Sequence, residues 1–150
     1  MDHPLDDSRA SRIDALAREL RSLVGKLKRR FREQSGIGDL TGSQTAVLLR
    51  LEKEGPATTS NLARAEGMRP QSMGTLIAAL ESAGLVTGTP DPSDGRQTIL
   101  SLTDTCRQQI EQGRAARQDW LCRTIEARFS PAEQDQLIAA VGLLGRLVQD

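Results

Sequence analysis

The sequence predicts a mainly α-helical chain with one small β-hairpin, and three observations predict it. Apolar residues recur at steps of three and four through most of the 150 residues, as they do on one face of a helix. Helix-start and helix-stop residues separate these stretches, and a polar tip lies between two short β-rich runs. Aromatic residues make up only 2% of the chain, so we expect an aliphatic core.

The first two predicted helices precede the Gly-Pro pair at residues 55–56. The first covers residues 8–34 and places its apolar side chains on one face: Ile13, Leu16, Leu20, Leu23, Val24, Leu27 and Phe31. The second follows a capping box, in which Thr41 and Gln44 can bond to each other's backbone amides. It runs through Leu51 and stops before the Gly-Pro pair.

The next two predicted helices lie close together. Thr58 can cap a short third helix, which closes at Gly67. Pro70 occupies the first position of a fourth helix, which ends at Gly84. One stripe of the fourth helix is apolar and faces inward: Met73, Leu76, Ile77 and Leu80.

A hairpin and two further helices complete the chain. The runs at 85–90 and 97–103 flank the polar tip and read as two strands. Thr103 can cap a fifth helix that extends to about Ala127. Ser130 begins a second capping box, and the last helix carries an apolar stripe: Leu137, Ile138, Val141, Leu144, Leu147 and Val148.

A helix, a tight turn, a second helix and a hairpin form a winged helix-turn-helix core, which we place at residues 40–103. In such a core the second helix, at about 70–83, enters a major groove of duplex DNA, and the wing, at 86–101, reaches the minor groove. The helices at 8–36 and 104–150 have apolar stripes too broad for this small core to bury. We therefore expect a single-domain protomer that forms a homodimer and binds a pseudo-palindromic site.

Residues 40–103 resemble the DNA-binding core of the multiple antibiotic resistance regulator (MarR) family, and the flanking helices fit its dimerisation domain in position and length. The marks of the resemblance are Leu40-Thr41 with Gln44, Leu62-Ala63, Pro70-Gln71-Ser72, Leu80-Glu81 with Gly84-Leu85, and the wing pattern Asp91-Pro92-x-Asp94-x-Arg96 ending in Leu102-Thr103. The resemblance implies a cytoplasmic transcription regulator, more often a repressor, that binds double-stranded DNA. It also implies release of DNA when a small aromatic or phenolic anion binds.

The resemblance assigns roles at the wing tip. Arg96 is expected to enter the minor groove and Asp94 to hold its guanidinium, which a carboxylate can bind bidentately. Asp91 with Pro92 is expected to shape the turn. The alternative is a solvated tip whose surface ion pair contributes little to stability.

Polar residues at the start of the fourth helix are the candidates for contacts to bases and phosphates. They are Arg69, Gln71, Ser72, Gly74 and Thr75. The alternative is an ordinary polar helix surface. Two positions depart from the common family pattern, because Thr75 stands where arginine is frequent and Gly95 where a basic residue is often found.

Charge is unevenly distributed along the chain. Residues 56–103 hold three arginines against four acids, so this core has no net positive charge to attract DNA. It must contact phosphates through individually placed side chains and helix N-termini. Residues 8–34 hold nine Lys or Arg against three acids, and five of the nine basic residues lie within 26–32. This run can be a solvated helix face, a source of phosphate contacts beside the operator, or a site for an acidic ligand.

Other classes of function find little support. The sequence has no Gly-rich phosphate loop and no metal-ligand spacing, and its one histidine is His3, so we expect neither an enzyme nor a cofactor. The chain shows no secretory or membrane-spanning run, so we expect no membrane partner. A rival function is a winged-helix sensor or protein-interaction module with weak DNA binding, which the acidic core favours.

The cysteines offer a second rival, a redox-switched regulator. Cys106 lies at the start of the fifth helix, where the helix N-terminus can lower a thiol pKa. Cys122 is expected to be a buried apolar residue. Trp120 is expected in the core or an interface, with the lining of an effector pocket as the alternative.

Overall fold

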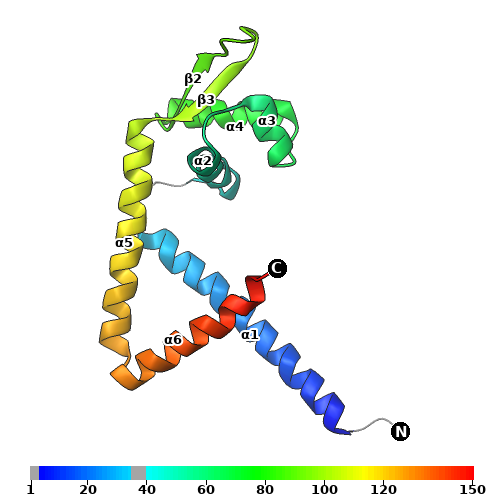
Figure 1. The fold of residues 1–150 in the computed structure, drawn as a ribbon, viewed down its shortest axis with the longest axis vertical. Coiled ribbons are helices and arrows are strands. Elements are labelled where there is room, and N and C mark those ends of the chain that lie inside the picture. Colours follow the sequence, from blue (N-terminus) through cyan, green and yellow to red (C-terminus); the bar gives the residue numbers. More distant parts are fainter. Residues whose placement is uncertain (1–3, 35–39) are drawn as a thin grey trace. The chain divides into compact units, whose positions relative to one another are not determined.

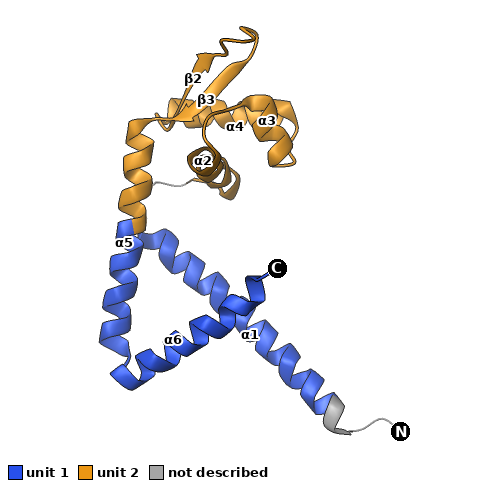
Figure 2. Ribbon diagram, in the orientation of Figure 1, with its two compact units in different colours: residues 1–35, 115–150 blue, residues 36–114 orange. Residues whose placement is uncertain are grey.

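The structure is a computed structural model that describes residues 4–34 and 40–150 (Figure 1). The chain divides into two compact units, one formed by residues 1–35 and 115–150 and the other by residues 36–114 (Figure 2). We call them the helical unit and the winged-helix unit. Helix α5 (Asp104–Arg128) begins in the winged-helix unit and ends in the helical unit.

The winged-helix unit contains three helices and three short strands before α5. They are α2 (Gly42–Glu54), β1 (Ala57–Thr58), α3 (Thr59–Ala65), α4 (Pro70–Ser82), β2 (Val86–Pro90) and β3 (Thr98–Leu102). The strands form an antiparallel sheet in the order β1-β3-β2. Ala57 pairs with Leu100 on one side of β3, and Gly88 pairs with Leu100 on the other.

An aliphatic core holds this unit together. Its fully buried large side chains come from α2, α3, α4, β3 and α5: Val47, Leu48, Leu51, Leu62, Met73, Leu80, Leu100 and Cys106. The inward stripe predicted for the fourth helix is confirmed, except that Leu76 is only partly buried at its edge. Burial of this stripe fixes which face of α4 remains in solvent.

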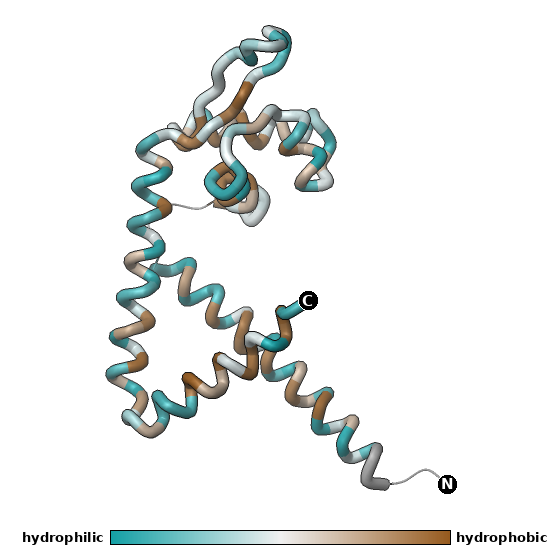
Figure 3. Tube along the Cα trace, in the orientation of Figure 1, coloured by the Kyte–Doolittle hydropathy of each residue, from teal (hydrophilic) through white to brown (hydrophobic). Residues whose placement is uncertain are grey.

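The helical unit consists of α1 (Pro4–Gln34), the second part of α5, α6 (Pro131–Gly145) and the 3-10 turn η1 (Arg146–Val148). Phe31 of α1 packs edge-to-face on Trp120 of α5, with ring centroids 5.7 Å apart. Most of its other large apolar side chains remain exposed, and Figure 3 shows hydrophobic positions recurring along α1 and α6. The unit therefore leaves unburied the stripes that the sequence predicts.

The predicted fold class is confirmed, and six α-helices and the wing occur in the expected order. Thr41, Thr58 and Ser130 cap their helices through side-chain oxygens, as predicted. Three details differ. The two-residue strand β1 was not predicted, and α1 begins at Pro4 rather than at residue 8. Regular α6 ends at Gly145, so the last two predicted apolar positions, Leu147 and Val148, lie in η1.

The division into units also differs from the predicted segments. Residues 104–114 of α5 group with the winged helix, although the sequence assigns all of 104–150 to dimerisation helices. The reason is that Cys106 and Ile110 lie in the winged-helix core. Residues 36–39, which contain the expected end of the first dimerisation segment, lie outside the described residues.

Candidate nucleic-acid interface

The turn between α3 and α4 sets the direction of the predicted recognition helix. Gly67 adopts a positive φ of 63°, which other residues adopt only at a cost, and the Met68 amide donates to the carbonyl of Ala63 at 2.8 Å. Glu66, in the same turn, accepts a hydrogen bond from Nε of Arg50 at 2.6 Å. The turn is thus attached both to its own helix and to α2.

The first turn of α4 is open to solvent. Arg69 is the N-cap residue and makes no side-chain capping bond, and Pro70 occupies the first turn. No acidic residue lies in that turn, so the positive end of the helix dipole is uncompensated there. Backbone amides at such a helix start can bind a phosphate oxygen.

The candidate base-contacting residues take different positions on α4. Arg69, Gln71, Ser72 and Thr75 are exposed, whereas Gly74 is half-buried. The Thr75 hydroxyl donates to the carbonyl of Gln71 at 3.2 Å, so its proton is engaged and its oxygen remains an acceptor. The helix therefore presents a short polar strip in which Gln71 has both an amide donor and an acceptor.

Asp91 shapes the wing turn, as the sequence predicts. Its Oδ1 accepts hydrogen bonds from the backbone amide of Ser93 at 2.9 Å and from the Ser93 hydroxyl at 2.8 Å. These bonds favour the ionised carboxylate and lower the pKa of Asp91 below its usual value. Asp91 is therefore occupied within the loop and leaves Asp94 as the acid beside Arg96.

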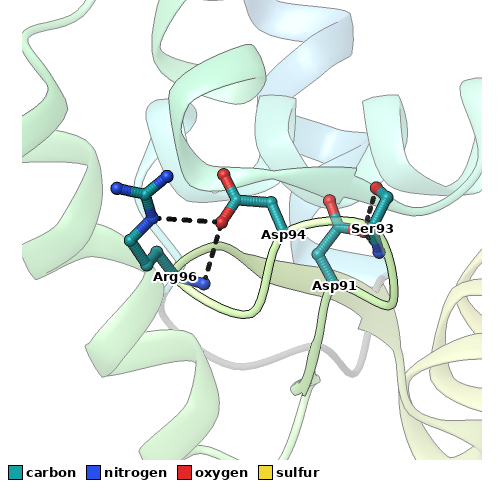
Figure 4. A network of polar contacts seen from close by, with 4 residues as sticks. All are labelled: Asp91, Ser93, Asp94 and Arg96. Carbon is teal, nitrogen blue, oxygen red and sulfur yellow. Dashed lines mark hydrogen bonds and ion pairs between the residues drawn. The ribbon is translucent and has the colours of Figure 1, made fainter.

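Asp94 holds Arg96 by one oxygen (Figure 4). Oδ1 of Asp94 accepts the backbone amide of Arg96 at 3.1 Å and its side-chain Nε at 3.3 Å. The predicted bidentate contact to the guanidinium is therefore replaced by a contact that involves one side-chain nitrogen. The reason is that the two residues lie in one tight turn, where the same oxygen also satisfies the backbone.

This arrangement leaves the outer edge of the guanidinium available. The Arg96 side chain is 94% exposed, and among the described residues its two Nη groups have no hydrogen-bond partner. The Asp94 side chain is 38% exposed. The wing thus presents a charged, planar donor whose stem is restrained at its base.

Three ion pairs of the winged-helix unit were not predicted. Arg114 of α5 contacts Glu52 of α2 through both terminal nitrogens, and Arg50 bonds to Glu54 as well as to Glu66. The hydrogen bonds to Glu66 and Glu54 raise the pKa of Arg50, and the bond to Glu66 is the larger cause. Glu52 and Glu54 therefore neutralise arginines of the same unit.

Cys106 has the opposite character to the one expected from its position. Its side chain is fully buried, and desolvation raises the pKa of its thiol. Its backbone amide does lie at the helix start, where it bonds to Thr103, but the Sγ atom points into the core. The predicted lowering of the thiol pKa is therefore wrong. Cys122 is exposed rather than buried, and both cysteines are free.

Peroxide treatment is expected to leave DNA binding of the reduced protein unchanged within about twofold, because the buried thiol of Cys106 reacts slowly. Mass spectrometry should locate oxidation at the exposed Cys122. Cys122→Ser is the control, since it should abolish the oxidation without changing DNA binding. Loss of DNA binding in Cys122→Ser after peroxide would show that Cys106 is a redox switch.

Within the parts of the chain that the structure describes, no helix is both long and apolar enough to cross a membrane. The same parts contain no group of three or more His, Cys, Asp or Glu side chains that could hold a metal ion.

Comparison with known proteins connects this geometry to a family. The sequence model of the MarR family matches residues 40–98. An HTH-type transcriptional regulator of Mycobacterium bovis is 35% identical over 135 residues, which cover 90% of this chain and 94% of the relative. The repressor MdtR of Bacillus subtilis is 27% identical over 131 residues, covering 87% of this chain and 81% of the relative.

Solved structures show the same fold. A transcriptional regulator of Pseudomonas aeruginosa superposes with a TM-score of 0.76 and 36% identity, covering 91% of this chain and 96% of that one. A mutant of the S. aureus regulator MepR bound to an oligodeoxyribonucleotide gives a TM-score of 0.71 at 20% identity, covering 89% of this chain and 98% of that one. Family model, relatives and fold agree, and the chain belongs to the MarR family of DNA-binding, winged helix-turn-helix transcription regulators.

Proposed function

We propose that this MarR-family chain is a homodimeric, ligand-responsive transcriptional repressor that acts in the cytoplasm on a pseudo-palindromic operator. The observation that carries the proposal is the wing tip, where Asp94 restrains Arg96 and leaves its outer nitrogens free. A restrained arginine loses less side-chain entropy when it binds DNA. A narrow A·T-rich minor groove has a strong negative potential and favours such a contact.

In this proposal the first turn of α4 enters the major groove. Gln71 can pair with adenine through its amide, and Ser72 and Thr75 can contact base edges or phosphates. Arg69 lies beside the open helix N-terminus and can contact the backbone. Half-buried Gly74 presents no side chain and allows close approach of the DNA backbone.

The exposed apolar side chains of the helical unit support the dimer. Six of them lie on α6 and η1 and are between 44% and 85% exposed: Ile138, Val141, Leu143, Leu144, Leu147 and Val148. Four of α1 are between 43% and 63% exposed: Ile13, Leu16, Leu23 and Val24. A patch of this kind on a separate chain indicates an interface. A two-fold dimer would present two recognition helices about one DNA turn apart.

One of the relatives supports the repressor role. MdtR, which resembles this chain over most of its length, is a repressor. The MepR mutant, whose structure was solved with an oligodeoxyribonucleotide bound, has the same fold. A dimer that covers about one to two turns of duplex can block a promoter that overlaps its operator.

An open groove on α1 supports a small anionic effector. The groove has a volume of about 370 Å³ and is lined by Leu20, Arg21, Val24, Gly25 and Lys28. Its lining combines apolar carbons with two cations, which suits an aromatic carboxylate or phenolate.

Addition of 4-hydroxybenzoate should therefore weaken DNA binding of the wild type by about tenfold, a typical coupling between two sites. The double variant Arg21→Gln/Lys28→Gln should lose this response. Lys26→Gln removes one charge outside the groove lining and should keep the response. An equal response of all three proteins would contradict an effector site in this groove.

Selection from a pool of random duplexes tests the operator. At low salt, purified protein should enrich a pseudo-palindrome with half-sites about one helical turn apart and A·T-rich flanks. If no sequence is enriched, the chain is a sensor or protein-interaction module with weak DNA binding. The excess of acids over arginines in residues 56–103 would then explain the weak binding.

A further inference from the structure

The residue that joins the wing to α5 makes hydrogen bonds to two separate segments of the chain. The hydroxyl of Thr103 donates to the carbonyl oxygen of Gly84 at 2.7 Å and accepts the backbone amide of Cys106 at 3.1 Å. The backbone amide of Thr103 donates to the carbonyl of Leu85 at 3.1 Å. One half-buried side chain therefore connects the end of the recognition helix to the start of α5.

The backbone after α4 is arranged to receive this bond. Gly84 adopts a positive φ of 73°, and its amide donates to the carbonyl of Glu81 at 3.0 Å. The amide of Leu85 returns to Leu80 at 3.0 Å, so the helix closes in a left-handed turn. The Gly84 carbonyl lies beyond the last helical turn, and Thr103 satisfies it.

The first part of α5 is attached to the winged helix at further points. Cys106 and Ile110 are buried in the core, at 0% and 4% exposure. Arg114 forms its ion pair with Glu52 of α2. These contacts hold α5 against the unit as a whole, whereas Thr103 bonds to the segment that directly follows the recognition helix.

We propose that Thr103 is a positioning residue for DNA binding, whose two hydroxyl bonds fix the angle between α4 and α5. This inference rests on the proposed homodimer, in which α5 follows the wing and continues from the winged-helix unit into residues of the helical unit. With the hydroxyl bridge intact, both recognition helices meet half-sites of one fixed spacing. Without it, the end of α4 can shift relative to the start of α5, and the dimer tolerates altered spacing.

Three substitutions separate the two hydrogen bonds. Thr103→Ser keeps both of them. Thr103→Asp keeps the helix cap, since a carboxylate accepts the Cys106 amide, but it cannot donate to the Gly84 carbonyl. Thr103→Val keeps the shape and loses both bonds. Ser130→Ala is the matched control, because it removes the equivalent cap of α6 without touching the recognition helix.

The experiment compares binding of the full chain to two duplexes, the selected operator and the same operator with one base pair inserted between its half-sites. The insertion rotates the half-sites by about one tenth of a turn. Wild type, Thr103→Ser and Ser130→Ala should prefer the original operator by at least about tenfold, which corresponds to about 1.4 kcal/mol. Thr103→Asp and Thr103→Val should prefer it by less than about threefold.

Each outcome has a separate meaning. If Thr103→Asp, folded by circular dichroism, keeps the wild-type preference, the positioning role is wrong. If Ser130→Ala loses the preference as Thr103→Asp does, general loss of stability explains both and the positioning role is again wrong. If wild type itself shows no preference, the proposed dimeric recognition fails, and the inference fails with it.

Discussion

Arg96→Ala is expected to reduce operator affinity by about ten- to a hundredfold for each wing, the usual range for loss of one specific arginine contact. The physical reason is that the Arg96 side chain is 94% exposed and contributes almost nothing to packing of the wing. Its removal should therefore change DNA binding without changing the fold. Fluorescence anisotropy with a labelled operator measures the affinity, and circular dichroism checks the helix content.

Substitutions at two positions distinguish charge from restraint. Arg96→Lys keeps the charge but lacks the planar guanidinium, so it should recover only part of the affinity. Asp94→Ala leaves the arginine in place and removes the oxygen that holds both its backbone and its Nε. We expect a smaller loss for Asp94→Ala, about three- to tenfold, as one charge-assisted restraint is removed. Full operator affinity of Arg96→Ala would show that the wing arginine stays in solvent and does not contact the DNA.

The second large effect is expected at the exposed apolar face of α6. Ile138→Glu/Val141→Glu places two carboxylates where the side chains are 70% and 67% exposed in the single chain. Burying charges in an apolar interface is strongly unfavourable, so the double variant should be a monomer at about 10 μM, whereas wild type should be a dimer at that concentration. Sedimentation equilibrium measures this change.

Loss of the dimer should also lower operator affinity by more than about a hundredfold, because the two half-sites then bind separate chains. Gln136→Glu adds one charge at an exposed position of the same helix and is the matched control. It should remain a dimer with wild-type affinity. A stable, folded wild-type monomer at micromolar concentration would contradict the dimer.

The sequence predicts the local elements well, because their signals lie within a few residues. The caps at Thr41, Thr58 and Ser130 each involve an amide three residues away, and the structure confirms all three. The turn function of Asp91 is equally local and is also confirmed. Amphipathic spacing predicted which side of α4 is buried, since one face of a helix is set by sequence alone.

Features that depend on tertiary pairing were not predictable. The Arg50 to Glu66 and Arg114 to Glu52 pairs join residues 16 and 62 positions apart, and no local pattern marks either. Strand β1 has only two residues and exists because Ala57 pairs with Leu100. At Cys106 a local effect competes with a tertiary one. The helix start would lower the pKa of the thiol, but packing places the same thiol in the core, where burial raises its pKa.

The central claim, that two wings lie in the minor groove of one operator, is tested most directly by hydroxyl-radical footprinting, since the radical attacks sugars along that groove. On the selected duplex, wild type should protect two symmetric minor-groove tracts outside the half-sites. Arg96→Ala, at a concentration that saturates the duplex, should lose both tracts while protection of the half-sites remains. A single tract, or tracts that Arg96→Ala leaves unchanged, would contradict the claim.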